Sequence, residues 1–248
     1  MVEILGRTED EWLRIYPDLV ALATENEPLT DNPEFVRALK LRIAQKHREA
    51  GVRIIDPENT YIDDRTKIGS GTVVHPFCFL RGACDIGCDV MLYPYNDIED
   101  TEIGNGADVR SSFIVGAKIG AKTTVGPFAT LRRGSEVGKG CRVGDYVEIK
   151  KATLADGVKV AHLAYIGDAE VGSNTNVGCG TVFANYNGKI KQHTVVGKNV
   201  FLGANTNLVA PLKIGDGAYI AAGSTVTDDV PTELLCIARS RQVFKVKK

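Results

Sequence analysis

The sequence has almost no net charge. Lys and Arg number 30 against 31 Asp and Glu, so the formal net charge is -1. Without a broad field of one sign, nothing draws the protein to nucleic acid or to an anionic membrane surface, and we expect neither as a partner. The balance favours chemistry on a small molecule.

Long apolar runs are also missing. No stretch approaches the roughly 18 apolar residues that a membrane span needs. The start, MVEILGRTEDEW, lacks the basic first residues and the apolar stretch of a secretory signal. We therefore expect a soluble, cytoplasmic protein that does not enter a membrane.

The cysteines lack the spacing of a metal site or a disulfide framework. There is no C-x-x-C pair, and no His lies at zinc-ligand distance from a Cys. Cys78, Cys84 and Cys141 instead occupy a position of the repeat described next, which elsewhere holds Thr, Ala, Ser or Val. We predict that they are small buried side chains and that the protein holds no metal.

An aliphatic residue recurs every six positions through most of the chain, and no charged residue occurs among them. The first run is Ile62, Ile68, Val74, Leu80, Ile86, Leu92 and Ile98. After a five-residue step the series continues through Ile103, Val109, Ile114, Ile119, Val125, Leu131, Val137, Val143 and Ile149. It then passes through Leu154, Val160, Ile166, Val171 and Val177, and returns at Val196, Leu202, Leu208, Ile214, Ile220 and Val226.

A period of six matches neither the 3.6 residues of a helical turn nor the plain alternation of a strand. Gly often follows the aliphatic residue, and a small residue such as Thr66, Ala129 or Thr175 lies four positions after it. Short strands joined by sharp corners satisfy this spacing. If three sides close one coil, each aliphatic residue covers the one a coil below. We predict an all-β solenoid of triangular cross-section with about nine coils.

Helices are predicted before the repeat. Thr8 is a candidate N-cap with Glu11 reaching back to it, and Asn32 followed by Pro33 begins a second helix that ends at Gly51. The expected apolar residues are Trp12, Leu13, Tyr16, Leu19 and Val20 in the first helix and Val36, Leu39 and Ile43 in the second. The predicted organisation is a helical segment at 1–51, a solenoid domain at 52–230 and a C-terminal arm at 231–248. The solenoid needs cover at its ends and open faces, so a cap or an oligomer is expected.

Several polar residues interrupt the aliphatic lattice. His162 lies where side chains should point away from the core, and Arg132 and Lys150 precede it by 30 and 12 residues. These separations correspond to about two coils and one coil of the stack. With Tyr165 and Asn176 they could surround one groove. Two cations and amide donors near a His suit a phosphorylated substrate that undergoes proton transfer.

The largest break in the repeat is the segment FANYNGKIKQHTV, from Phe183 to Val195. A loop this long on a regular scaffold is more often functional than a simple connector. It contains Asn185, Tyr186 and Lys191, which are suited to hydrogen bonding and to holding an anion.

A resemblance to a known family rests on specific segments. VGPFATLRRG, VGDYVEIKKATL, VAHLAYIGDAEVG, NVGCGTVFANYNGKIK, LVAP and AAGSTVTDDVP, with RIIDPENTYID before the repeat, closely resemble the acetyltransferase domain of the GlmU family. The resemblance covers roughly residues 41–239. Members of that family are glucosamine-1-phosphate N-acetyltransferases joined to an N-acetylglucosamine-1-phosphate uridyltransferase. It implies a left-handed parallel β-helix, acetyl-coenzyme A as co-substrate, no metal, and a homotrimer whose site lies between neighbouring subunits.

The same resemblance assigns roles to individual residues. It implies that His162 is the general base for direct transfer of the acetyl group to the amine of glucosamine-1-phosphate, in the synthesis of UDP-N-acetylglucosamine and of peptidoglycan precursors. The implied sugar-phosphate contacts are Arg132, Lys150, Tyr165, Asn176 and Lys191. The implied acetyl-coenzyme A contacts are Cys179, Asn185, Tyr186, Ala204, Ala222 and Arg239. Glu148 is a candidate for orienting His162 or the amine.

The sequence departs from the family in three ways. The residues before the repeat contain no Gly-rich nucleotide loop, so we predict no uridyltransferase activity and expect a separate uridyltransferase as partner. Ala204 stands where the family has Ser, Cys179 stands where Ala is usual, and the tail differs around Arg239. A lost neutral hydrogen bond costs about 0.5 to 1.5 kcal/mol, so the donor site would be weakened but not abolished.

Two other functions remain open from the sequence. One is the same transfer to another amino sugar, including nucleotide-linked ones, and an acceptor panel separates the two. The other is a non-catalytic trimeric scaffold, which the retained polar residues and His162 argue against. A zinc hydratase is disfavoured because His75, His162 and His193 are not spaced to converge on one ion.

Overall fold

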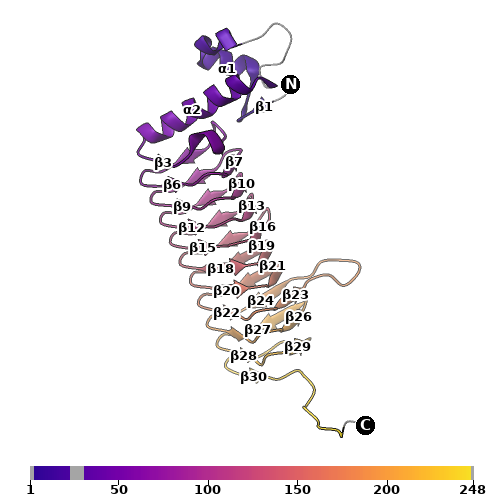
Figure 1. Cartoon of the computed structure of the whole chain (residues 1–248). Helices are drawn as coiled ribbons and strands as arrows, with labels where there is room; N and C mark the ends of the chain where they lie inside the picture. Colours follow the sequence, from indigo (N-terminus) through magenta and orange to yellow (C-terminus); the bar gives the residue numbers. More distant parts are fainter. Residues whose placement is uncertain (1–2, 23–30, 247–248) are drawn as a thin grey trace.

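The predicted all-β solenoid is confirmed. A computed structural model describes residues 3–22 and 31–246, and Figure 1 shows a helical cap at one end of a tall stack of short strands. Strands from successive coils pair in parallel, and the chain winds as a left-handed parallel β-helix. At the other end the chain leaves as a tail (Figure 1). Residues 1–2, 23–30 and 247–248 of the expected helical segment and arm lie outside the described residues.

One face of the solenoid is an 11-stranded parallel sheet to which each coil contributes one strand. In order along the stack its strands are β3 (Arg53–Ile54), β6 (Val73–Val74), β9 (Met91–Leu92), β12 (Asp108–Val109), β15 (Thr124–Val125), β18 (Arg142–Asp145), β20 (Lys159–His162), β22 (Asn176–Val177), β25 (Phe201–Leu202), β28 (Tyr219–Ile220) and β30 (Leu235–Cys236).

The other two faces form one 17-stranded sheet, because β19 (Glu148–Leu154) and β21 (Tyr165–Val171) run round the corner between them. On the second face they join β4 (Tyr61–Ile62), β7 (Phe79–Arg81), β10 (Asp97–Glu99), β13 (Phe113–Val115), β16 (Thr130–Leu131), β23 (Val182–Ala184), β26 (Asn207–Val209) and β29 (Thr225–Val226). On the third they join β5 (Lys67–Ile68), β8 (Asp85–Ile86), β11 (Glu102–Ile103), β14 (Lys118–Ile119), β17 (Glu136–Val137), β24 (Thr194–Val196) and β27 (Leu212–Ile214).

The six-residue repeat sets the register of these sheets. Ile98 pairs with Ile114 and Val109 pairs with Val125, and all four side chains are buried. Each aliphatic residue thus covers its counterpart one coil away, which is the stacking that the sequence predicted. The stack is longer than the predicted count of about nine coils, because eleven strands line its first face. The additional strands β3 and β30 lie outside the regular six-residue series, so the count missed them.

The corners of the coils are filled by small side chains. The hydroxyl of Thr123 donates to the carbonyl oxygen of Gly138 over 2.7 Å, inside the stack. Cys78, Cys84 and Cys141 are buried as predicted, and burial raises the pKa of the Cys78 thiol to about 11. These thiols are therefore unreactive filler near neutral pH.

A helical cap covers the first coils. It consists of β1 (Glu3–Ile4), β2 (Arg7–Thr8), α1 (Glu9–Ile15), the 3-10 helix η1 (Pro17–Leu22) and α2 (Pro33–Glu49), and the 3-10 helix η3 (Pro57–Asn59) follows β3. The predicted caps are confirmed: Thr8 and Glu11 form a capping box, and Asn32 accepts hydrogen bonds from the first turn of α2. None of the helices in the described ranges is long and apolar enough to cross a membrane.

Two of the three predicted core residues of α2, Leu39 and Ile43, are confirmed, and Phe35 takes the place predicted for Val36. Phe35, Leu39 and Ile43 are buried at a spacing of four residues, whereas Val36 is only half-buried. Successive residues of a helix point about 100° apart, so burying Phe35 turns Val36 away from the core. Trp12 of α1 is fully buried in the same core.

Candidate functional site

His162 forms a pair with an acidic residue from the neighbouring coil. It is the last residue of β20 and stands in register with Asp145, the last residue of β18. The Nδ1 atom of His162 lies 2.7 Å from Oδ1 of Asp145, and both side chains are exposed. The hydrogen bond to His162 and one from the backbone lower the pKa of the Asp145 carboxyl below its usual value. The pair therefore consists of an imidazole and a carboxylate at the surface.

Three of the predicted donor contacts line up with His162 on the following coils. Cys179, Ala204 and Ala222 each stand two residues after paired strand positions of the 11-stranded sheet. The backbone N–H of Asn205 donates to the carbonyl of Cys179 over 2.7 Å, which fixes this stacking. With His162 they form one column of side chains parallel to the solenoid axis. Cys179, Ala204 and Ala222 are called the donor column below, and His162 stands at its head.

A smooth strip lies beside this column. Gly178 and Gly203 precede Cys179 and Ala204, and a Cβ added at Gly203 would lie 2.7 Å from the Cα of Ala222. Such a contact is too short for a real side chain, so the coils approach this closely only because glycine is present. The strip therefore carries no side chains where the coils stack beside the column.

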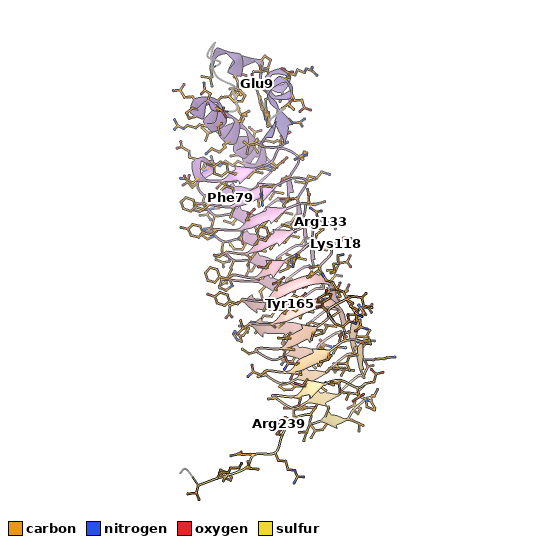
Figure 2. The ribbon with its side chains drawn as sticks, turned by 90° about the vertical axis from the view of Figure 1, so that its right-hand side faces the viewer. Glu9, Phe79, Lys118, Arg133, Tyr165 and Arg239 are labelled. Carbon is orange, nitrogen blue, oxygen red and sulfur yellow. The ribbon has the colours of Figure 1, made fainter. Side chains whose placement is uncertain are left out.

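A second polar cluster lies at the next corner of the coils, where β19 and β21 turn from the second face to the third, so the second face separates it from His162. Asp168 is its centre: Lys150 donates to its Oδ2 over 3.0 Å, and Nδ2 of Asn185 donates to the same oxygen. The Asn185 amide also reaches the Tyr165 hydroxyl at 3.4 Å. Figure 2 shows Tyr165 near the middle of the stack.

Charges in this cluster are coupled. Burial opposes ionisation of Asp168, but the hydrogen bonds from Lys150 and Asn185 outweigh it and lower the pKa of Asp168. The amine of Lys191 and the carboxylate of Asp168 raise the pKa of Lys150, while the neighbouring Lys150 lowers the pKa of Lys191. The cluster thus holds a buried ammonium that is paired with a carboxylate, next to a second amine from the loop.

Arg132 lies directly one coil before Lys150. Leu131 and Ile149, which precede them, are paired in β16 and β19. Arg132 Nη1 lies 3.1 Å from Oε1 of Glu148, and both side chains are exposed. Glu148 thus contacts Arg132, and within the chain the His162 imidazole is contacted by Asp145 and not by the candidate Glu148.

Other predicted residues stand apart from these groups within one chain. Asn176 lies in β22 on the 11-stranded sheet, between Lys159 and Phe201. Tyr186 is exposed in the loop after β23, where its hydroxyl donates to the carbonyl of Gly188. Arg239 lies near Gly223, beside the far end of the donor column, and Figure 2 shows it where the tail begins.

Sequence reasoning missed Asp145, Gly167 and Asp168. Asp145 and Asp168 are each about one coil from a predicted residue, His162 and Lys150. A search for carboxylates at that separation would have found both. Gly167 gave no signal of its own, since Gly is common throughout the repeat. Within 3–22 and 31–246 no group of three or more His, Cys, Asp or Glu side chains could hold a metal ion.

Known proteins resemble this chain in their repeat and in their sequence. Residues 116–151 and 193–228 match the family model described as bacterial transferase hexapeptide (six repeats). The chain is 50% identical over 209 residues to the bifunctional protein GlmU of Staphylococcus haemolyticus (strain JCSC1435), covering 84% of this chain and 46% of that protein. With GlmU of Clostridium novyi (strain NT) it shares 47% identity over 231 residues, which are 93% of this chain and 50% of that protein.

Likeness to solved structures is weaker. LpxA, a UDP-N-acetylglucosamine acyltransferase from Bacteroides fragilis 9343, is 19% identical with a TM-score of 0.35, covering 68% of this chain and 70% of that one. A likeness at this level says nothing about the reaction.

The parallel coils, the repeat and the family match define the chain as a hexapeptide-repeat protein. More particularly, it is a relative of GlmU, and the predicted resemblance to the acetyltransferase portion of that family is confirmed. The chain spans about half the length of these curated relatives.

Proposed function

We propose that the protein is an acetyl-coenzyme A-dependent N-acetyltransferase that converts glucosamine-1-phosphate to N-acetylglucosamine-1-phosphate. The observation that carries the proposal is the His162–Asp145 pair, at 2.7 Å, which stands at the head of the donor column. The base and the donor column lie at one corner of the coils, and the anion site around Lys150 lies at the next corner.

His162 would act as the general base. The amine of an amino sugar is protonated near neutral pH and cannot attack a carbonyl until it loses a proton. A neutral imidazole is suited to accept that proton, and a positioned base of this kind typically contributes about 10²- to 10⁴-fold. The exposure of His162 leaves its ring accessible to an incoming amine.

Lys150, Arg132 and Lys191 would hold the phosphate of the acceptor. The side chain of Lys150 is buried, and its ammonium group is paired with Asp168. Arg132 lies one coil before Lys150, and Lys191 comes from the loop, so the three cations are supplied by two coils and the loop. Charge-assisted hydrogen bonds to phosphate would fix the sugar so that its amine faces His162 of a neighbouring copy of the chain in the proposed trimer. Tyr165 and Asn185 border the same cluster and would contact the sugar or the donor.

The column of Cys179, Ala204 and Ala222 fits the donor, with Arg239 at its far end. When bound there, acetyl-coenzyme A supplies the thioester carbonyl that the amine attacks. Small side chains leave the strip open along the coils, and a guanidinium at its end suits the phosphates of coenzyme A. The two departures from the family, Ala204 and Cys179, belong to the donor column, which therefore offers one hydroxyl fewer than the family's site.

A homotrimer is part of the proposal. An apolar edge made of Phe77, Tyr95, Phe128, Tyr146 and Leu163 is exposed along one corner. Its rings stack in pairs, 5.2 Å apart for Phe77 and Tyr95 and 5.5 Å for Phe128 and Tyr146. Tyr146 and Leu163 directly follow Asp145 and His162. Ser111 separates the two ring pairs. The exposed apolar side chains on either side of it favour contact with another chain, and a second copy there would bring its own residues to the base.

Enzyme assays test the proposal directly. Thiol release from acetyl-coenzyme A is measured with glucosamine-1-phosphate and with a panel of other amino sugars, nucleotide-linked ones included. We expect turnover to be fastest with glucosamine-1-phosphate. Faster turnover with another amino sugar would move the assignment to that acceptor, and no turnover with any of them in a folded trimer would favour the scaffold.

A further inference from the structure

We propose that Asp145 is a positioning residue that holds the proton of His162 on Nδ1 and leaves Nε2 as the basic atom. This inference rests on the proposed function for its kinetic consequence. Its structural part, the tautomer of His162, can be tested without any activity.

The fold fixes both partners at the same height on neighbouring coils. Asp145 and His162 are Cα partners at the ends of β18 and β20. The backbone N–H of Leu163 donates to the carbonyl of Asp145 over 2.8 Å, so the strand ends are tied together immediately beside the pair. A Cβ added at Gly144 would strike the carbonyl of Ala161, so only glycine lets the coils approach this closely here. The side chains thus meet through backbone geometry.

The chemistry of the contact determines where the proton lies. An ionised carboxylate only accepts hydrogen bonds, and the pKa of Asp145 is lowered, so it is ionised near neutral pH. The 2.7 Å separation of Oδ1 and Nδ1 therefore requires the proton to be on Nδ1. A neutral imidazole carries one proton, so Nε2 keeps its lone pair and is the atom that can accept a proton from the amine.

The surroundings contain few other charges that could take over this role. Arg142, on the same strand as Asp145, contributes to the lowered pKa of the carboxyl. Glu148, the next acidic residue along the chain, is committed to Arg132 at 3.1 Å. We therefore expect that no other carboxylate replaces Asp145 when it is substituted.

Three variants in the full chain test the proposal: Asp145→Asn, Asp145→Ala and, as a matched control, Glu136→Gln. Glu136 is an exposed carboxylate on the third face, 3.9 Å from Lys118. Nitrogen-15 NMR of the histidine rings reports which nitrogen carries the proton, and His162→Ala assigns the signal. We expect the Nδ1–H tautomer of His162 in the wild type and in Glu136→Gln, and a shift toward the Nε2–H tautomer in Asp145→Ala.

Kinetics provide the second readout. In serine proteases, a catalytic His in the wrong tautomer lowers kcat by up to about 10⁴-fold. Because the pair here is exposed, we expect a smaller effect, a fall in kcat of roughly 10- to 100-fold in both Asp145 variants. The KM values for both substrates should stay within about twofold, because Asp145 lies outside the phosphate cluster. A kcat unchanged in Asp145→Ala, or an Nε2–H tautomer in the wild type, would overturn the proposal. If the wild type has no transferase activity, the proposed function falls, and the NMR result still decides the position of the proton.

Discussion

Gly167 lies where the side chains of Tyr165 and Asn185 meet, and Gly167→Ala should damage the site while sparing the fold. An added Cβ would lie 2.4 Å from the hydroxyl oxygen of Tyr165, 2.6 Å from its Cζ and 2.8 Å from Nδ2 of Asn185. Favourable heavy-atom contacts are about 3.5 Å or longer, so the two groups must retreat by roughly 0.7 to 1.1 Å. The atoms that must move belong to the ends of side chains, and Gly167 does not have a positive φ. We therefore expect the free energy of unfolding to change by less than about 1 kcal/mol.

The same displacement should be costly for catalysis. A misplacement of about 1 Å in a positioning group can cost roughly 10²-fold, so we expect kcat/KM for glucosamine-1-phosphate to fall by about that factor. Gly172→Ala is the control. Its Cβ would lie 2.5 Å from the carbonyl carbon of Gly197, where backbone cannot swing away. This variant should lose about 1 to 3 kcal/mol in urea unfolding. A Gly167→Ala enzyme with wild-type kcat/KM, or one as destabilised as Gly172→Ala, would refute the reasoning.

Three further predictions concern stability, the acceptor and assembly. His47 is 4% exposed, and burial lowers its pKa, with Lys46 acting in the same direction and Asp64 opposing. The unfolded chain therefore takes up the proton first, so the free energy of unfolding measured in urea should fall as pH drops below about 6.5. His47→Gln should flatten that slope. Lys150→Met should raise the KM for glucosamine-1-phosphate by roughly 10- to 100-fold and barely change that for acetyl-coenzyme A, in steady-state assays. Tyr146→Asp should reduce the mass measured by light scattering from trimer to monomer, and an unchanged mass would remove Tyr146 from the interface.

The architecture could be predicted because the repeating aliphatic residues are the residues that form the core. An aliphatic residue every six positions places one buried side chain on each side of a coil, and pairs such as Leu131 and Ile149 follow from that spacing alone. The first and last strands of the 11-stranded sheet, β3 and β30, were missed because Ile54 and Cys236 stand outside the regular series of aliphatic residues. Phe35 was missed because two apolar residues, Phe35 and Val36, are adjacent and either could face the core.

The site could be predicted only in part. Residue types, coil separations and the long loop indicated the polar candidates around His162, Arg132 and Lys150. The family resemblance added the donor-side positions Cys179, Ala204, Ala222 and Arg239. The partners of these side chains were not predictable, since Asp145 and Glu148 both lie near His162 in the repeat and only the strand register chooses between them. Asp168 was missed for a related reason: its role depends on Lys150 and Asn185 pointing at the same oxygen, which the spacing of the repeat does not reveal.

The central claim is that His162 removes a proton from an amino-sugar acceptor during acetyl transfer. The most direct measurement is thiol release from acetyl-coenzyme A with glucosamine-1-phosphate, comparing the wild type with His162→Ala after both are shown to have the same unfolding midpoint. The account predicts turnover in the wild type and a loss of about 10²- to 10⁴-fold in the variant. Near-native turnover in His162→Ala would contradict it.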